Sequence, residues 1–195
     1  MEYICGVTFA PFACAGAFFK PGAKESLAMM KERTGANFVI FVPGGLQETP
    51  QSEEICFTSK ATMEDDELIA MIEYAKEIGL RVALKPTVNC KNGTWRAHIN
   101  FFDEDVPCEP KGGNWFASYT AFQLHYAKIA EQHDCEMFIA GCEMVMSEHR
   151  EAEWRKLLSD IRQVYHGLLS YNTDKYQEHR VNWWDAVDVI SSSGY

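Results

Sequence analysis

The sequence predicts an α/β fold with a parallel sheet, and within that class a (β/α)8 barrel (TIM barrel). Short apolar runs alternate along the chain with segments whose apolar residues recur at helical spacing. Most of these runs are continuous, as expected for parallel strands that are covered on both faces. A doubly wound sheet would usually carry a glycine-rich phosphate loop after its first strand, and residues 9–16 have no such pattern. Polar and aromatic residues follow the runs instead, which is typical of a barrel.

The apolar runs predict six strands, about six of the eight that close such a barrel. In chain order they are Ile4 to Thr8, Asn37 to Val42, Arg81 to Pro86, Met137 to Gly141, Leu168 to Tyr171 and Val187 to Ser191. Strand–helix units that repeat in this way imply right-handed crossovers. We therefore expect one domain over residues 1–195, truncated before the seventh and eighth strands of such a barrel.

Four helices are expected between these strands. The first lies near residues 24–33 and is closed by Gly35. The other three carry apolar stripes, formed by Leu68, Met71, Ile72 and Ala75, by Tyr119, Phe122, Tyr126 and Ile129, and by Trp154, Leu157, Leu158 and Ile161. Thr62 and Asp65 have capping-box spacing ahead of the second helix, and Gly79 follows it as a stop. Gly167 is expected to end the last helix.

Composition limits the class of protein. The net charge of −10 argues against nucleic acid and against anionic membranes as partners, because both are polyanions. The seven cysteines are odd in number and show no disulfide framework, which favours reduced thiols. The chain starts without a basic region, and no apolar run approaches the roughly 18 residues of a membrane span. We expect a cytoplasmic protein, and the sequence points to no particular protein partner.

The stretch from Cys135 to Met144 is the most informative part of the chain. Its apolar run ends in Gly141-Cys142-Glu143, which places a carboxylate just past the carboxyl end of a strand, where a barrel carries its active site. Apolar and aromatic surroundings should raise the pKa of this carboxyl group, as a general acid near neutral pH requires. The alternative is a structural glutamate that caps a helix or pairs with an arginine.

The segment after the third strand, Thr87 to Asn114, is too long to be only a connector. With Lys85 before it, it contributes Trp95 and Arg96, and Trp115 follows directly. Tryptophan rings stack on sugar rings, and arginine and lysine bind hydroxyl groups by hydrogen bonds. The alternative is that the two tryptophans only anchor the loop to the barrel. Trp154 and one of Trp183 and Trp184 are expected in the core.

A metal site and a cysteine nucleophile are the other chemistries that these residue types could support. The candidate ligands His133, Cys135, Cys142, Glu143 and His149 lie near one another in sequence, but their spacing fits no zinc template. Cys135 is also expected at the far end of the strand from Glu143. Nucleophilic catalysis through Cys142 lacks a histidine partner that the sequence can identify. We therefore expect no metal and no other cofactor.

Several motifs together resemble glycoside hydrolase family 113. These are Lys85-Pro86 with Gly93-Thr94-Trp95-Arg96, Trp115-Phe116-x-Ser118-Tyr119, Gly141-Cys142-Glu143-Met144, Ser170-Tyr171 and Trp184-Asp185-Ala186-x-Asp188. The resemblance runs along most of the chain in order. It implies a clan A (β/α)8 barrel and a retaining β-glycosidase, and endo-β-1,4-mannanase is the best-known activity of the family.

The resemblance also implies roles for individual residues. Glu143 would be the general acid/base, and Tyr195 would be the sixth-strand tyrosine that supports the nucleophile. The substrate-binding residues would be Lys85, Trp95, Arg96, Trp115, Cys142, Tyr171 and Asn172. A β-linked, mannan-like polysaccharide or oligosaccharide would be the substrate.

Departures from the family pattern fall on the expected substrate face. Thr87 stands where the family often has histidine, and Cys142 replaces the usual threonine or asparagine before the acid/base. The family's nucleophile is a glutamate at the end of the seventh strand, and a retaining mechanism needs it roughly 5 Å from the acid/base. We expect this chain to lack that glutamate and to be inactive on its own.

Three readings follow. The first is a retaining β-glycosidase in which Glu143 is the acid/base. The second is a non-catalytic carbohydrate-binding protein on the same barrel, which the changes at Thr87 and Cys142 favour. The third is a metal-dependent barrel enzyme.

Overall fold

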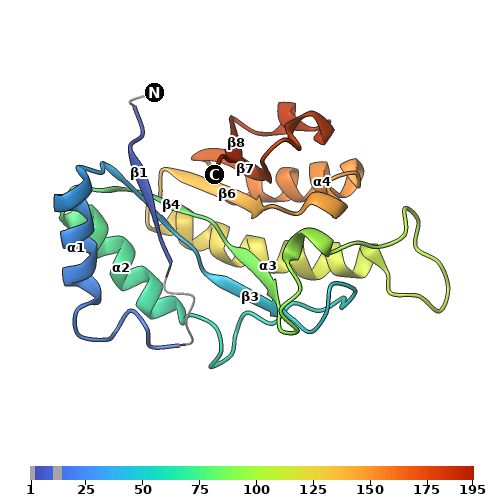
Figure 1. The fold of residues 1–195 in the computed structure, drawn as a ribbon, viewed down its shortest axis with the longest axis horizontal. Helices are drawn as coiled ribbons and strands as arrows, with labels where there is room; N and C mark the ends of the chain where they lie inside the picture. Colours follow the sequence, from blue (N-terminus) through green and yellow to red (C-terminus); the bar gives the residue numbers. More distant parts are fainter. Residues whose placement is uncertain (1–2, 11–14) are drawn as a thin grey trace.

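The computed structural model describes residues 3–10 and 15–195 of the chain. Its centre is a six-stranded, fully parallel sheet with helices packed against it (Figure 1). The strands lie in the order β1 (Gly6–Phe9), β2 (Phe38–Phe41), β4 (Arg81–Leu84), β6 (Met137–Cys142), β7 (Leu168–Asp174) and β8 (Val189–Ser193). All six predicted strands are confirmed, with boundaries that shift by at most three residues. The fold is therefore an α/β half-barrel.

The four long helices are also confirmed. They are α1 (Ala23–Thr34), α2 (Asp65–Glu77), α3 (Gly112–Gln132) and α4 (Glu151–Arg162). All three predicted apolar stripes are buried, and Trp154 and Trp183 are fully buried core residues. Gly35 and Gly79 follow α1 and α2 with φ values of 68° and 79°, the left-handed conformation that glycine adopts without steric cost.

Two predicted helix ends were wrong. The residue before α2 is Glu64, whose backbone N–H donates to Glu67 Oε1 at 2.8 Å, whereas the Thr62 hydroxyl donates to Ser59 O. The last residue of α4 is Arg162, so Gly167 lies beyond the helix end and does not terminate it. Both errors arise because a capping residue is defined by backbone geometry, which spacing alone does not specify.

Two short strands were not predicted. Strand β3 (Gly44–Gln47) pairs in parallel with β5 (Thr87–Cys90). They continue β2 and β4 along the chain beyond Pro43 and Pro86, and the backbone ladder resumes where Thr87 N–H donates to Pro43 O at 3.0 Å. Proline has no N–H to donate, so each long strand is interrupted at that point. The segment from Thr87 to Asn114 therefore holds β5, the 3-10 helix η1 (Arg96–His98) and the start of α3.

The two faces of the sheet differ in their cover. Alternate residues of the central strands, such as Val39, Val82 and Phe138, pack in the large cluster with the helices. The residues between them, Phe38 and Met137 among them, form a small cluster made only of strand residues and their immediate neighbours. This second face is the interior side of the barrel. Within the described ranges, no helix is long and apolar enough to cross a membrane.

Candidate active site

A pocket of about 430 Å³ lies at the carboxyl ends of the strands. Its walls come from β1, β2, β4, β6, β7 and β8 and from the segments that follow them, and Arg96 reaches in from η1. Six of the predicted site residues line it: Lys85, Arg96, Cys142, Glu143, Asn172 and Tyr195. Residues that lie more than 100 positions apart in sequence meet here because parallel strands end at the same edge of a sheet.

The backbone around Glu143 is irregular. The register between β6 and β7 shifts between Ile139 and Cys142, and Gly141 has a φ of 152°. A Cβ atom on Gly141 would lie 2.9 Å from the Tyr119 hydroxyl and 2.9 Å from the Tyr171 ring, so glycine is required for this close approach. Glu143 itself has a φ of 56°, in the left-handed region that residues with a side chain seldom adopt. Such irregularities re-aim a side chain at the end of a strand.

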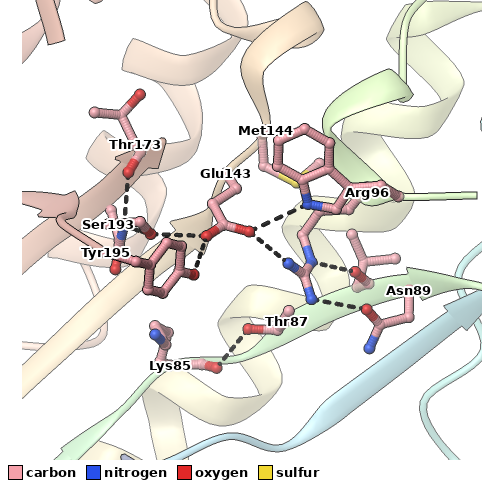
Figure 2. A network of polar contacts seen from close by, with 12 residues as sticks. Lys85, Thr87, Asn89, Arg96, Glu143, Met144, Thr173, Ser193 and Tyr195 are labelled. Carbon is pink, nitrogen blue, oxygen red and sulfur yellow. Dashed lines mark hydrogen bonds and ion pairs between the residues drawn. The ribbon is translucent and has the colours of Figure 1, made fainter. Parts of the chain in front are cut away.

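Four donors surround the Glu143 carboxylate (Figure 2). Oε1 accepts hydrogen bonds from the Ser193 and Tyr195 hydroxyl groups, each at 2.7 Å. Oε2 accepts one from Arg96 Nη1 at 2.8 Å and one from the Trp95 indole at 3.2 Å. The residue is only 4% exposed. The carboxylate is thus buried at the wall of the pocket with both oxygens occupied.

These donors reverse the predicted direction of the pKa shift. Burial acts to raise the pKa of Glu143, but the hydrogen bonds from Tyr195, Ser193 and Trp95 and the charge of Arg96 outweigh it. The pKa therefore lies below its ordinary value. The prediction of a raised pKa was wrong because the surroundings of Glu143 are polar donors rather than apolar rings.

Arg96 and Trp95 are held in place by the segment that carries them. Arg96 Nε donates to Val88 O at 3.1 Å, and its Nη2 donates to Asn89 Oδ1 at 2.9 Å, so β5 fixes the guanidinium on its side away from Glu143. Trp95 is 44% exposed, and its ring meets His98 edge to face. An indole that is anchored at its N–H and open on its face can stack on a ligand.

The other side of Glu143 is built from β7 and β8. Asn172 Nδ2 donates to Ser193 Oγ at 3.0 Å, so Asn172 orients the serine that contacts Glu143. Tyr195 is 86% exposed as a residue, yet its hydroxyl reaches the carboxylate, which raises the pKa of that hydroxyl. The expected role of Tyr195 was support of a nucleophile, and in this structure its partner is the acid/base candidate.

Lys85 and Cys142 complete the polar wall. Burial is the main cause that raises the pKa of the Cys142 thiol, so the thiol is neutral near neutral pH and is a poor nucleophile. Thr87 is buried, and its hydroxyl donates to Lys85 O at 3.0 Å (Figure 2).

The structure corrects two of the predicted substrate-binding residues. Trp115 is fully buried in α3, where its indole N–H donates to Gln47 Oε1 at 2.9 Å and its ring stacks on Tyr119. Tyr171 is fully buried between Trp154 and Trp183. Neither residue reaches the pocket surface, because both side chains point to the face of the sheet that the helices cover.

The suggested metal ligands do not converge. His133 contacts Glu73 at 2.6 Å, and His149 contacts Asp103 at 3.0 Å. Cys135 precedes β6, and Cys142 is the last residue of that strand. Over residues 3–10 and 15–195, no group of three or more histidine, cysteine, aspartate or glutamate residues could hold a metal ion.

Sequence reasoning missed three residues that matter at this site. Ser193 contacts Glu143, and Asn89 contacts Arg96. Glu148 is a buried carboxyl group behind β6. Ser193 lies in the run Ser191-Ser192-Ser193, and its position at a strand end is a signal that could have identified it. Asn89 belongs to the unpredicted strand β5, and no local pattern marks Glu148.

Comparisons with known proteins find a family and solved structures that this chain is similar to. The model of Glycoside Hydrolase Family 113 matches residues 7–195. A β-1,4-mannanase of family 113, solved as a complex, has 57% identity and a TM-score of 0.98 over 100% of this chain and 63% of its own. The family 113 β-mannanase from Alicyclobacillus acidocaldarius, in complex with ManMIm, has 40% identity and a TM-score of 0.94 over 99% of this chain and 61% of its own.

More distant structures share the fold alone. A β-mannanase from Streptomyces thermolilacinus has 14% identity and a TM-score of 0.56 over 97% of this chain and 57% of its own. No curated protein matches the chain. The chain spans 63% and 61% of the lengths of the two family 113 structures, so it corresponds to part of their catalytic fold.

Proposed function

Because the chain belongs to glycoside hydrolase family 113, we propose that it carries the acid/base half of a retaining β-glycosidase that acts on a β-mannan-like substrate. The observation that supports this most is the Glu143 carboxylate at the wall of a strand-end pocket, where Arg96 and three further donors hold it. The two relatives of 57% and 40% identity are described as mannanases.

In the proposed first step, protonated Glu143 donates its proton to the glycosidic oxygen as the bond between that oxygen and the anomeric carbon breaks. A second carboxylate forms a covalent bond to the anomeric carbon. In the second step, ionised Glu143 takes a proton from water while the water oxygen displaces that carboxylate. The transition states of both steps resemble an oxocarbenium ion.

The lowered pKa of Glu143 fits the second step better than the first. Glu143 has the only carboxylate side chain among the described residues that line the pocket. A nucleophile carboxylate roughly 5 Å away would raise the pKa of Glu143 by like-charge repulsion and would compete for its donors. We propose that a second carboxylate, outside the described pocket lining, switches Glu143 to a general acid.

The test of this assignment is the substitution Glu143→Gln in a form of the protein that contains the second carboxylate and hydrolyses the substrate. Glutamine keeps the size of the side chain and cannot donate a carboxyl proton. We expect hydrolysis of β-1,4-manno-oligosaccharides to fall by roughly 100-fold or more, since a positioned general acid/base contributes about that much. Glu131→Gln is the matched control, because Glu131 binds His166 at a distant surface. Near wild-type hydrolysis by Glu143→Gln would contradict the assignment.

A second candidate function is sugar binding without hydrolysis. The single carboxylate in the described pocket wall favours it for the 195-residue chain alone. We expect calorimetry to detect binding of manno-oligosaccharides to this chain, with no reducing ends released over the same period. Measurable turnover by the isolated chain would exclude this second function.

A further inference from the structure

Glu143, the proposed acid/base, has a strained backbone that its neighbours must hold in place. The left-handed φ of 56° is disfavoured for any residue with a Cβ atom, and such a conformation persists only where the surroundings fix it. Two backbone N–H groups are tied down at this point. Glu143 N–H donates to Asn172 O at 2.8 Å, and Met144 N–H donates to the Tyr171 hydroxyl at 3.1 Å.

The second of these bonds depends on the orientation of one hydroxyl proton. Tyr171 has a single O–H, and that group donates to Glu148 Oε1 at 2.7 Å. The lone pairs of the tyrosine oxygen are then free to accept from Met144 N–H. The Thr173 hydroxyl donates to the same Glu148 oxygen at 2.7 Å. Glu148 therefore sets the direction in which the Tyr171 hydroxyl points.

Glu148 occupies an unfavourable place for a carboxyl group. It is 2% exposed, and burial is the main cause that raises its pKa. Its other oxygen, Oε2, is buried and has no hydrogen-bond partner among the described residues. An apolar side chain would fill the same space without this penalty. Packing alone therefore does not account for a glutamate here.

The segment that carries Glu148 is itself fixed. The Trp154 indole donates to Ser147 O at 2.9 Å, and the Trp183 indole donates to Glu148 O at 3.1 Å. The backbone that carries the Glu148 carboxyl group is thus held in place behind the end of β6.

We propose that Glu148 is a positioning residue for Glu143, acting through the Tyr171 hydroxyl on the Met144 amide. The inference rests on the proposed role of Glu143 in the reaction. Loss of the Glu148 acceptor frees the Tyr171 hydroxyl to rotate, Met144 N–H loses its partner, and the Glu143 carboxylate leaves the position where Trp95 and Arg96 meet it.

The Trp95 indole proton reports this position without any need for catalysis. It donates to Glu143 Oε2, and Trp95→Phe identifies its signal among those of the five tryptophans in a proton–nitrogen NMR spectrum. In the wild-type chain we expect this signal to titrate with Glu143, at a midpoint below the ordinary glutamate pKa. The titratable or charged groups around the carboxylate are Arg96, Lys85, Tyr195 and Cys142, and His98 meets the Trp95 ring edge to face.

Three variants test this relay, the chain of contacts that runs from Glu148 through the Tyr171 hydroxyl to the Met144 amide. Tyr171→Phe keeps the ring and removes the hydroxyl, and Glu148→Met keeps the length and removes the acceptor. In both variants we expect the chemical shift of the Trp95 indole proton to move upfield, toward the value of a solvent-exposed indole. We also expect the midpoint of its titration to rise. Glu148→Gln retains an acceptor oxygen and should restore the wild-type signal and midpoint.

Tyr165→Phe is the structural control. It also removes a buried tyrosine hydrogen bond, to Cys135 O at 2.7 Å, at the opposite end of β6. We expect it to lower the unfolding midpoint and to leave the Trp95 titration unchanged. A Trp95 signal that stays unchanged in folded Tyr171→Phe overturns the proposal, as does a Tyr165→Phe spectrum that changes equally. If Glu148→Met does not fold, Tyr171→Phe decides alone.

Kinetics separate this inference from the function it rests on. In a hydrolytically active form, we expect Tyr171→Phe to lower kcat/KM for oligosaccharides, whose leaving groups need a proton, more than for aryl glycosides with activated leaving groups. Equal losses for both substrates contradict a positioning role. If Glu143→Gln leaves hydrolysis intact, the proposed function fails, while the NMR result still decides the relay.

Discussion

At the scale of single residues, two glutamates five positions apart have pKa values that are shifted in opposite directions. Glu143 accepts four hydrogen bonds, one of them from a guanidinium, and its pKa is lowered. Glu148 lies deeper in the core and accepts two bonds on one oxygen only, and burial raises its pKa. Burial acts in the same direction on both groups, so the number and charge of the donors decide the outcome.

This contrast predicts opposite effects of pH on stability. Glu143 has a depressed pKa in the folded state, so it contributes stability above the unfolded-state pKa of about 4.3 and loses it as pH falls through its folded pKa. Glu148 has a raised folded pKa, so it costs stability as pH rises through the range above about 4.3. Between about pH 3 and pH 7, Glu143→Gln should become less stable relative to wild type, and Glu148→Gln more stable.

Urea unfolding of the wild type and both variants at several pH values measures these differences. One unit of pKa shift corresponds to about 1.4 kcal/mol. Slopes of the same sign for the two variants would show that the two carboxyl groups do not differ as described.

Trp95 and Trp115, which were both predicted to bind substrate, also differ at this scale. Trp95 is 44% exposed beside Glu143, whereas Trp115 is fully buried in α3. We expect Trp115→Ala to lower the free energy of unfolding by about 3–5 kcal/mol, and Trp95→Ala to change it by less than about 1 kcal/mol. Calorimetry with manno-oligosaccharides should show weaker binding for Trp95→Ala. A variant at Trp115 with wild-type stability and lost binding would contradict this division.

At the scale of elements, strand β6 places the site because it ends irregularly. The register shift against β7 and the backbone of Gly141 turn the strand end so that Glu143 faces the pocket. The Tyr119 hydroxyl, which donates to Ala140 O at 3.3 Å, and the Tyr171 ring leave no room for a side chain at Gly141. Helix α3 and strand β7 together therefore determine how β6 can end.

Gly141→Ala tests the requirement for glycine at this point. Its Cβ atom would lie 2.9 Å from two aromatic side chains, and the φ of 152° is unsuited to alanine. We expect a loss of roughly 1–3 kcal/mol in the free energy of unfolding. Gly44→Ala in β3 is the matched control, since no atom lies within 4 Å of its added Cβ, and its stability should be unchanged or slightly higher. Similar losses at both positions, measured by urea unfolding, would refute the steric argument.

At the scale of the whole molecule, the described sheet is open at both sides. Within residues 3–10 and 15–195, β1 and β8 each pair with a single neighbouring strand. The central strand β6 is buried at all six positions, whereas β8 is buried only at Ser193, and Ile190 is 60% exposed. Stability should therefore fall from the centre of the sheet to its sides.

Hydrogen exchange of the 195-residue chain measures this gradient. We expect the amides of β4 and β6 to exchange slowest and those of β1 and β8 to exchange faster by at least about tenfold, because local opening of an edge strand breaks one ladder rather than two. The order should survive dilution, since a net charge of −10 opposes self-association through the open edges. Equal protection of all six strands would mean that the edges are paired in solution.

The sequence by itself determined most of the elements and the order in which they follow one another. Apolar periodicity is a local property, so the six strands of the main sheet and the four long helices could be read from it, and Glu143 could be placed at the end of a strand. The pair β3 and β5 was missed because Gly44–Gln47 and Thr87–Cys90 are short and lack apolar runs.

Only the tertiary structure decided which side chains meet and what charge each can carry. Ser193 and Arg96 come from distant parts of the chain, and their contacts with Glu143 reverse the predicted direction of its pKa shift. Trp95 is partly exposed beside Glu143, whereas Trp115 is buried in α3 against Gln47 of β3, and only the folded chain separates the two. These properties arise from distances between remote residues, and no local pattern in a sequence encodes such distances.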